Sequence, residues 1–172
     1  MTDVGGLADE RLRLPAHRVA PRAIRWWTVR SALGGAAVLA PQLVATAGLS
    51  AVGRDPSVLL GTSVLTLVVG LVHLLVVPRW RFRVHRWEAT GEAVHTLTGW
   101  VRREWRIAPI ARIQTVDTHQ GPLQRAFGLS SVTVTTASSH GSLHLDGLDA
   151  DGARRLAHDL TAAAEAAGGD AT

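Results

Sequence analysis

The feature that most constrains this chain is a long apolar block over residues 31–77, in which only Arg54 and Asp55 carry a charge. These two residues divide the block into uncharged runs at 31–53 and 56–78. A helix rises about 1.5 Å per residue, so each run would be about 34 Å long, which exceeds a bilayer hydrocarbon core of about 30 Å. The block therefore predicts two membrane-spanning helices joined by a turn, a transmembrane helical hairpin.

Two other interpretations of this block remain. A cleaved signal peptide would account for the first run, with a cleavage site at Ala45-Thr46-Ala47, although signal peptides more usually begin closer to the first residue and are shorter. In a wholly soluble protein both runs would be core helices. The short alternating segments that follow would not cover two helices that are apolar on every side, so we expect the hairpin.

The two predicted spans differ in composition. The first contains the small residues Gly34, Gly35, Ala36 and Ala37, whereas the second is richer in Leu and Val. Small residues permit close helix contact, so we expect the first span to pack on the second. His73 lies near the end of the second span, and we expect it to be neutral and close to the membrane interface.

Charge predicts the orientation of the hairpin. Both outer flanks are basic, whereas the turn carries one Arg and one Asp, so the positive-inside rule places both termini in the cytoplasm. The chain would then be a multi-pass protein of the inner (cytoplasmic) membrane. The flanking arginines are Arg11, Arg13, Arg18, Arg22, Arg25 and Arg30 before the hairpin, and Arg79, Arg81, Arg83 and Arg86 after it.

The residues beside the spans are the candidates for membrane contact. The second arginine group could also hold anionic lipid headgroups, at about 1 kcal/mol per charge, although setting the topology and attracting headgroups in general are favoured over a specific lipid site. Tryptophans at the ends of spans anchor helices at headgroup level. The candidate anchors are Trp26, Trp27 and Trp80.

The composition excludes several classes of function. There is no cysteine, so disulfides, Cys-based zinc sites and thiol nucleophiles are excluded. From Glu88 onward there are 7 arginines and 10 acidic residues, which gives a net charge of −3. A nucleic-acid-binding domain concentrates positive charge on itself, so we expect no nucleic-acid partner.

After the hairpin the pattern changes to short alternating segments. We predict strands over 80–84, 94–98, 101–107, 113–118, 131–137 and 142–146, and a C-terminal amphipathic helix over 153–164. The fold class is therefore α+β, with an antiparallel sheet or barrel that the terminal helix covers. The expected organisation is a flexible basic segment at 1–20, the hairpin at 21–78, a cytoplasmic β domain at 79–168 and a tail at 169–172.

A motif joins the fourth and fifth predicted strands. Pro122 is placed for the first position of a short helix, and Gly128 for the left-handed residue that ends it. This motif, with the strands around it, resembles the bacterial pleckstrin-homology (PH)-like membrane proteins of the YdbS type. The residues that carry the resemblance, which we expect to be mainly structural, are Arg112, Gln114, Gly121, Pro122, Leu123, Gln124, Arg125 and Gly128.

The resemblance implies two transmembrane helices followed by a cytoplasmic PH-like domain, a bent sheet or barrel of about seven strands closed by a C-terminal helix. The alternating segments account for six of these strands. The family offers no catalytic residues, and its members often occur beside larger relatives with repeated PH-like units. The resemblance therefore implies membrane lipids and another membrane protein, such as a larger PH-like relative, as partners.

The sequence contains little that predicts catalysis. His140 and His144 are four residues apart across a turn and a strand, which is not the spacing of a metal site. There is no phosphate-binding Gly-rich loop and no nucleophile elbow. We expect no enzyme activity and no cofactor, although a polar pocket with convergent titratable groups would reopen the question. The favoured function is a protein-interaction or scaffold module, and the alternative is an anionic-lipid headgroup sensor.

Overall fold

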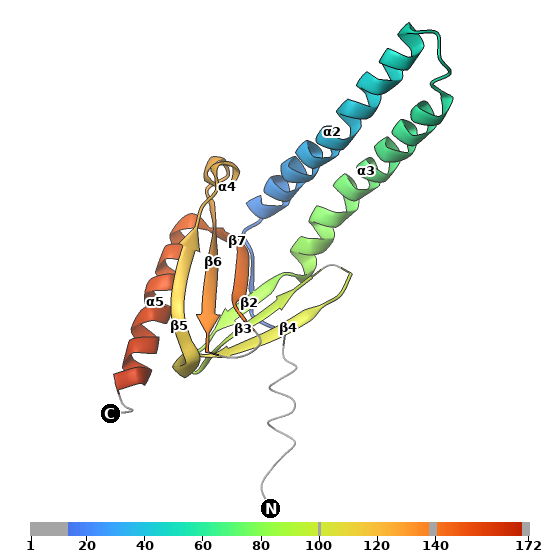
Figure 1. Ribbon diagram of the computed structural model, residues 1–172. Helices are drawn as coiled ribbons and strands as arrows, with labels where there is room; N and C mark the ends of the chain where they lie inside the picture. Colours follow the sequence, from blue (N-terminus) through green and yellow to red (C-terminus); the bar gives the residue numbers. More distant parts are fainter. Residues whose placement is uncertain (1–13, 100, 138–140, 170–172) are drawn as a thin grey trace, which may run out of the picture. The chain divides into compact units, whose positions relative to one another are not determined.

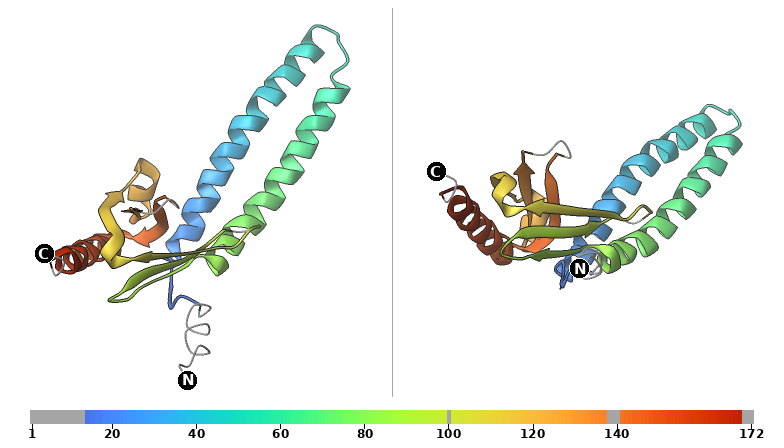
Figure 2. Two further views of the ribbon diagram at one scale, coloured as in Figure 1. Left: turned by 60° about the horizontal axis from the view of Figure 1, so that its bottom comes forward. Right: turned by 90° about the horizontal axis from the view of Figure 1, so that it is seen from below.

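The computed structural model describes residues 14–99, 101–137 and 141–169 of the chain (Figures 1 and 2). It divides into a helical unit, Pro21–Trp80, and a second unit that contains the residues from Arg81 onward together with the described residues up to Ala20. Most of the flexible segment expected at 1–20 lies outside the described residues. So does the tail expected at 169–172, except for Gly169, which is the last residue of the C-terminal helix. Each unit is described by itself below.

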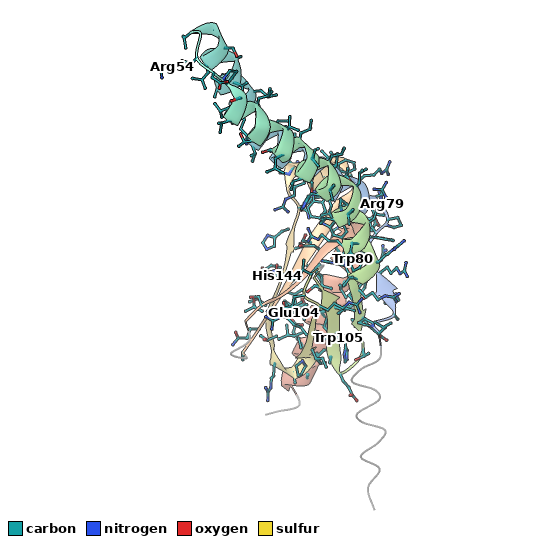
Figure 3. The ribbon with its side chains drawn as sticks, turned by 90° about the vertical axis from the view of Figure 1, so that its right-hand side faces the viewer. Arg54, Arg79, Trp80, Glu104, Trp105 and His144 are labelled. Atoms are coloured by element: carbon teal, nitrogen blue, oxygen red, sulfur yellow. The ribbon has the colours of Figure 1, made fainter. Side chains whose placement is uncertain are left out.

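The helical unit is a hairpin of two long helices. Helix α2 (Arg22–Ala51) has 30 residues and α3 (Ser57–Val84) has 28, which correspond to about 45 and 42 Å. Figure 3 shows Arg54 at the turn between them and Arg79 toward the far end of α3. The Asp55 carboxylate accepts hydrogen bonds of 2.9 Å from both the backbone N–H and the hydroxyl of Ser57, which starts α3 and lowers the pKa of Asp55.

The apolar side chains of this hairpin face outward. Both helices are long and apolar enough to cross a membrane, and side chains such as Val58 and Leu65 are 78% and 63% exposed. Each Å² of apolar surface left in water costs about 25 cal/mol, so a wholly soluble protein would not present this surface. The structure contains the predicted pair of long apolar helices, each able to cross a membrane, and the interpretation as buried core helices is wrong.

The expected close packing of the small residues is wrong. A Cβ built at Gly34 or Gly35 would have no atom within 4 Å apart from its chain neighbours and the backbone of its own helix. These glycines instead line a groove of about 500 Å³, together with Val38 of α2 and with Val69 and His73 of α3. Lipid tails are as apolar as these helices, so the hydrophobic effect does not force the two spans together inside a membrane.

The first predicted strand is also wrong, because residues 80–84 are the last turn of α3. Proline removes one helical hydrogen bond at Pro78, yet the helix continues past it. The Arg79 Nη1 donates a hydrogen bond of 2.7 Å to the carbonyl of Leu75, one turn earlier. No glycine or turn signal follows Pro78 before His85, so extending the existing helix is easier than starting a strand.

The second unit contains two antiparallel sheets. Sheet A has the order β1 (His17–Arg18), β2 (Arg86–Ala89), β3 (Ala93–Thr98) and β4 (Glu104–Pro109). Sheet B has the order β5 (Ile113–His119), β6 (Leu129–Thr136) and β7 (Leu143–Asp149). The connecting and terminal helices are η1 (Ile110–Arg112), α4 (Pro122–Ala126) and α5 (Ala150–Gly169). Strands β3 to β7 overlap the predicted ones, whereas β1 and β2 were not predicted.

Strand β1 belongs to an N-terminal segment that joins the two sheets. His17 pairs with Trp87 of β2, and the backbone N–H of Ala16 donates to the Glu88 carboxylate at 3.1 Å. The N–H of Ala20 then donates to the carbonyl of Gly147 in β7 at 2.9 Å. The segment therefore bonds to sheet A at one end and to sheet B at the other.

Over the residues that the structure describes, the two sheets do not close into a barrel. Their strands run in different directions, and α5 packs against sheet B (Figures 1 and 2). The core lies among both sheets and α5, as the predicted covering helix requires. It contains Val94 and Ala108 of sheet A, Val132, Val134, Leu143 and Leu145 of sheet B, and Ala153, Leu156 and Leu160 of α5.

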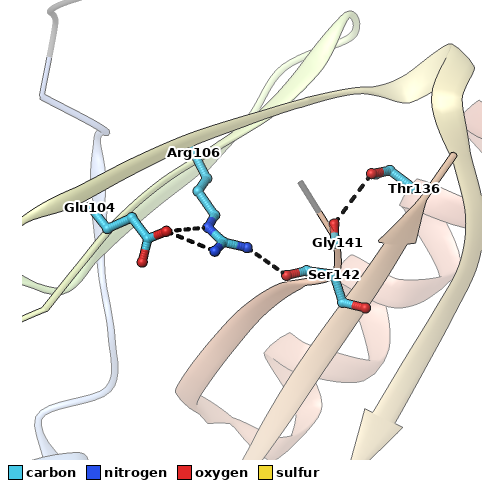
Figure 4. A network of polar contacts seen from close by, with 5 residues as sticks. All are labelled: Glu104, Arg106, Thr136, Gly141 and Ser142. Carbon is cyan, nitrogen blue, oxygen red and sulfur yellow. Dashed lines mark hydrogen bonds and ion pairs between the residues drawn. The ribbon is translucent and has the colours of Figure 1, made fainter. Parts of the chain in front are cut away.

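A polar contact also links the sheets away from this core. Arg106 of β4 donates through Nε to the Glu104 carboxylate at 2.8 Å, and through Nη1 to the carbonyl of Ser142 at 2.8 Å (Figure 4). Thr136 of β6 donates to the carbonyl of Gly141, on the same connection into β7, at 3.4 Å. One arginine thus ties an edge of sheet A to the start of β7.

The packing of α5 predicts a large cost for shortening Leu160, which is 2% exposed. Replacing a buried leucine by alanine costs about 2–5 kcal/mol, because the transfer energy is lost and a cavity remains. We expect Leu160→Ala to lower the free energy of unfolding of the full chain in detergent by that amount, measured by urea titration. Thr161→Ala, an exposed position on the same helix, is the control and should change it by less than about 0.5 kcal/mol. Equal effects of the two substitutions would contradict this packing.

Candidate functional site

The second unit contains a polar cleft of about 370 Å³. Arg81, at the end of α3, and His85, directly after it, form one wall. Thr98 and Gly99, at the end of β3, form a second wall, and His144 and Asp146 of β7 form the third. Arg81 and His85 share this wall because residues four apart lie on one face of a helix, and the N–H of His85 still bonds to the carbonyl of Arg81 at 2.8 Å.

His85 is the buried titratable group of the cleft, with an exposed fraction of 6%. Burial lowers the pKa of its imidazole below the ordinary value, and the positive charge of Arg81 lowers it further. The hydrogen bond to the Arg81 carbonyl and the negative charge of Asp146 act in the opposite direction but do not outweigh these effects. At neutral pH His85 is therefore uncharged.

The contacts of His85 define its tautomer. Its Nδ1 lies 2.9 Å from the carbonyl oxygen of Arg81. A carbonyl oxygen only accepts hydrogen bonds, so Nδ1 must carry the proton, and Nε2 of the neutral ring is then an acceptor. The cleft thus combines one permanent cation, one carboxylate and a neutral imidazole that accepts a hydrogen bond.

Gly99 shapes the loop wall of the cleft. Its φ is +104°, a backbone conformation that side chains disfavour, and a Cβ at this position would lie 1.8 Å from the carbonyl oxygen of Arg102. Only glycine fits here without a change in the loop. The backbone at Gly99 passes close to the Arg102 carbonyl, and this wall of the cleft therefore requires glycine at that position.

The structure separates the four arginines that the sequence groups together. Arg79 and Arg83 are both exposed and four residues apart on α3, so they share a face of that helix. Arg81 lines the cleft, and the Arg86 guanidinium donates to the carbonyl of Pro15 at 3.4 Å. A role of these four side chains in headgroup attraction stays a prediction.

The three predicted membrane anchors also differ. Trp26 and Trp27 are buried, with ring centroids 5.9 Å apart, whereas Trp80 is exposed (Figure 3). An interfacial role for these tryptophans stays a prediction.

The motif residues have local structural contacts. Pro122 is the first residue of α4, as predicted, and Gly128 after the helix has a φ of +63°. The buried Gln124 side chain accepts the N–H of Gly121 at 2.9 Å and donates to the hydroxyl of Ser131 at 2.7 Å. The carbonyl of Arg112 accepts the N–H of Ala137 at 3.1 Å, and the pairing of β5 with β6 shifts at Gln114. Leu123 and Arg125 lie within α4.

A second candidate surface lies on β4, the edge strand of sheet A. Trp105, labelled in Figure 3, and Ile107 alternate with the buried Ala108, so they lie on the face of β4 away from the core, and they are 41% and 48% exposed. Their neighbour Arg106 points the other way, toward Ser142. Large apolar side chains on an open sheet edge are typical of an interaction surface, because an edge strand also offers unpaired backbone groups.

Sequence reasoning did not identify the cleft. Its residues come from three elements that are far apart in the chain, and each is unremarkable alone. The spacing of Arg81 and His85 would have been a signal had residues 80–84 been interpreted as helix. Within the described residues, no group of three or more His, Asp or Glu side chains lies together as a metal site would require. His140 lies outside those residues.

Comparisons with known proteins agree with this architecture. A family model described as the bacterial PH domain matches residues 33–164, which extend from within α2 into α5. The transmembrane protein YdbS of Bacillus subtilis (strain 168) is 27% identical over 126 residues, which cover 73% of this chain and 79% of that protein. No solved structure matches the chain significantly.

The buried His85 predicts a loss of stability in acid. The folded state holds the pKa of His85 below its ordinary 6.5, so the unfolded chain binds the proton first as the pH falls. Stability is therefore fully present above pH 6.5, decreases as the pH falls below that value and levels off below the folded pKa. We expect the melting temperature of the full chain in detergent to fall between pH 7.5 and 5.5, and to fall less for His85→Gln. His158→Gln, at an exposed site on α5, should retain the wild-type decrease; an equally steep decrease for His85→Gln would refute the assignment.

Proposed function

Because this chain belongs to the bacterial PH domain family, we propose that it is an integral protein of the cytoplasmic membrane that presents a PH-like domain at the inner leaflet. The domain acts as a protein-interaction or scaffold module of a membrane complex. The relative from Bacillus subtilis is named a transmembrane protein, and both long helices of this chain suit a membrane. The basic flanks of the hairpin support the cytoplasmic placement of the domain.

The observation that carries the interaction role is the apolar edge of sheet A. The register places Trp105 opposite Leu97 and Ile107 opposite His95, so both exposed side chains lie on one face of β4. Soluble domains usually protect an edge strand with charge, proline or a covering element. Here the two charged side chains of the strand, those of Glu104 and Arg106, form an ion pair with each other. A partner strand or helix that covered Trp105 and Ile107 would remove apolar surface from water.

We favour binding over catalysis for this protein. The cleft does bring titratable groups together, which is the condition that would reopen the question of an enzyme. However, its buried histidine bonds to a backbone carbonyl, and His144 contacts Thr133, which does not line the cleft, at 3.1 Å. A base that activates a nucleophile must contact that nucleophile within the site. The family model is also described as a domain and not as an enzyme.

An anionic-lipid headgroup sensor is the second candidate. Arg79 and Arg83 support it, since both are exposed on one face of α3 beyond the apolar span. Two exposed charges would supply about 2 kcal/mol of attraction to an anionic surface, which assists membrane contact but gives little selectivity among anionic lipids. The interaction role is therefore preferred.

The orientation can be tested directly with reporter fusions. We expect reporters at the N-terminus and at Thr172 to be active on the cytoplasmic side, and a reporter inserted at Asp55 to be active on the outer side. The reason is the excess of arginine on both outer flanks over the single Arg54 in the turn. An outward location of either terminus would contradict the proposed placement of the domain.

The interaction surface can be tested by photo-crosslinking in cells. A crosslinking amino acid in place of Trp105 in the full chain should yield an adduct with a second membrane protein, identified by mass spectrometry, with a larger PH-like relative as the expected partner. The same amino acid at Thr161, which is exposed on α5, should not yield that adduct. Ile107→Ser should lower the yield by about tenfold, because apolar contact area is lost. Adducts with lipid alone would refute the proposal.

A further inference from the structure

We propose that β4 pairs antiparallel with β4 of a second copy of this chain when no other partner is present, in a two-fold symmetric dimer centred on Trp105. The inference rests on the proposed interaction role of the β4 edge and states what covers that edge when the chain is alone. Among the elements that the structure describes, β3 alone packs along the length of β4, so the far side of β4 is a sheet edge. An edge strand is a template for pairing with another chain.

The hydrogen bonds of sheet A show which residues of β4 direct their backbone groups outward. The N–H of Ile110 donates to the carbonyl of Glu92 at 2.8 Å, in line with the register of β3 and β4. Hydrogen-bonded pairs alternate with other pairs along an antiparallel ladder, so Arg106, four residues from Ile110, also bonds to β3. Trp105 and Ile107 therefore direct their N–H and C=O groups away from β3, where a second strand can reach them.

Charge selects the register of the proposed pairing. In a pairing centred on Trp105, each Glu104 lies directly opposite Arg106 of the second copy, and opposite charges across a sheet stabilise it. A pairing centred on Glu104 or on Arg106 would instead place like charges opposite each other. A pairing centred on Ile107 would place Pro109, which has no N–H to donate, opposite Trp105 in the ladder. The β4 sequence is therefore self-complementary about Trp105.

The ion pair within each chain can remain in this dimer. Oε1 of Glu104 accepts the Nε–H of Arg106 at 2.8 Å, and Arg106 also donates to the carbonyl of Ser142 (Figure 4). A carboxylate has two oxygens with about four acceptor sites, so Glu104 can accept from a second guanidinium while the first stays in place. The two carboxylates and the two guanidinium groups then alternate in sign along and across the strands. The pairing therefore requires Arg106 to give up none of its contacts.

The other face of the paired strands covers apolar surface. Trp105 and Ile107, on the face of β4 away from the core, are 41% and 48% exposed in the single chain. Trp105 forms a hydrogen-bonded pair with its own copy in this register, with the two Cα atoms about 5.5 Å apart. Indole rings at this separation contact each other, and aromatic pairs across strands stabilise a sheet. The dimer thus pairs the outward backbone groups, the charges and the apolar side chains of the edge together.

The register can be tested with single cysteines, because the chain contains none of its own. In the purified full chain in an uncharged detergent, the cysteine of Trp105→Cys would lie about 5.5 Å from its copy, within the Cα range of about 4.4–6.8 Å that a disulfide bridges. The cysteine of Ile107→Cys would lie more than about 13 Å from its copy, because four residues of strand separate them. We expect mild oxidation to give about tenfold more covalent dimer from Trp105→Cys than from Ile107→Cys. Equal yields from both variants, or no dimer from Trp105→Cys, would overturn the inference.

Charge reversal tests the pairing with Trp105 in place. Glu104→Arg and Arg106→Glu each place like charges opposite each other, so each should raise the dissociation constant of the dimer about tenfold, measured by mass photometry over a concentration series. An equal mixture of the two variants should regain the wild-type constant, because each is complementary to the other across the interface but not to itself. Thr161→Arg, at an exposed position on α5, is the control and should leave the constant unchanged.

Melting temperatures would show that both charge variants are folded. If one is not, the oligomeric state of the wild type and the two cysteine yields decide the matter. A monomeric wild type, or a mixture of folded variants that stays monomeric, would overturn the self-pairing. These outcomes are separable from those of the proposed function. A monomeric wild type with an intact cellular adduct to another membrane protein contradicts the self-pairing alone, whereas a dimer in detergent whose cellular adduct contains only a second copy supports it and contradicts the scaffold role.

Discussion

The packing of α5 against sheet B and η1, over a core shared with sheet A, is the interaction on which this unit depends. Two sheets of four and three strands do not close into a barrel, so neither sheet alone surrounds a core. Leu156 and Leu160 of α5 complete the cluster that contains Val94 of sheet A and Val132 of sheet B. Without the helix, this shared cluster would be open to water, at a cost of about 25 cal/mol for every Å² of apolar surface exposed.

An open pair of sheets has consequences that a closed barrel would not have. It leaves β4 as an unpaired edge, and it leaves room for a cleft where the end of β3 and strand β7 approach. Polar contacts hold the sheets together around these openings: Arg106 bonds to the Ser142 carbonyl, and Ala20 bonds to Gly147. Both candidate surfaces therefore result from the open arrangement of the sheets. The β4 surface is an edge strand, and the cleft is a gap between strands.

The sequence allowed most of the architecture to be predicted, for identifiable reasons. The alternation of apolar and polar residues predicted strands such as β6, where Val132 and Val134 are buried and Thr133 is not. The length of the two uncharged runs predicted the two long helices. Alternation failed at residues 80–84, because arginines that alternate with apolar residues also suit a helix that is already formed. Strand β1 has only two residues, so it is too short to show the alternation of buried and exposed side chains that is typical of a strand. The cleft depends on contacts between Arg81, Thr98 and Asp146, which no local pattern contains.

The arginines of this chain illustrate how position changes the use of one residue type. All 18 basic residues are arginine, so residue type alone does not distinguish a topological charge from a binding one. Exposed arginines such as Arg79 and Arg83 lie in water, where salt screens their attraction to anions. Arg81 differs because it faces a carboxylate and a buried, neutral imidazole within one cleft. The contacts of each arginine therefore follow from its place in the fold: Arg79 bonds to the Leu75 carbonyl, Arg86 to the Pro15 carbonyl and Arg106 to the Ser142 carbonyl.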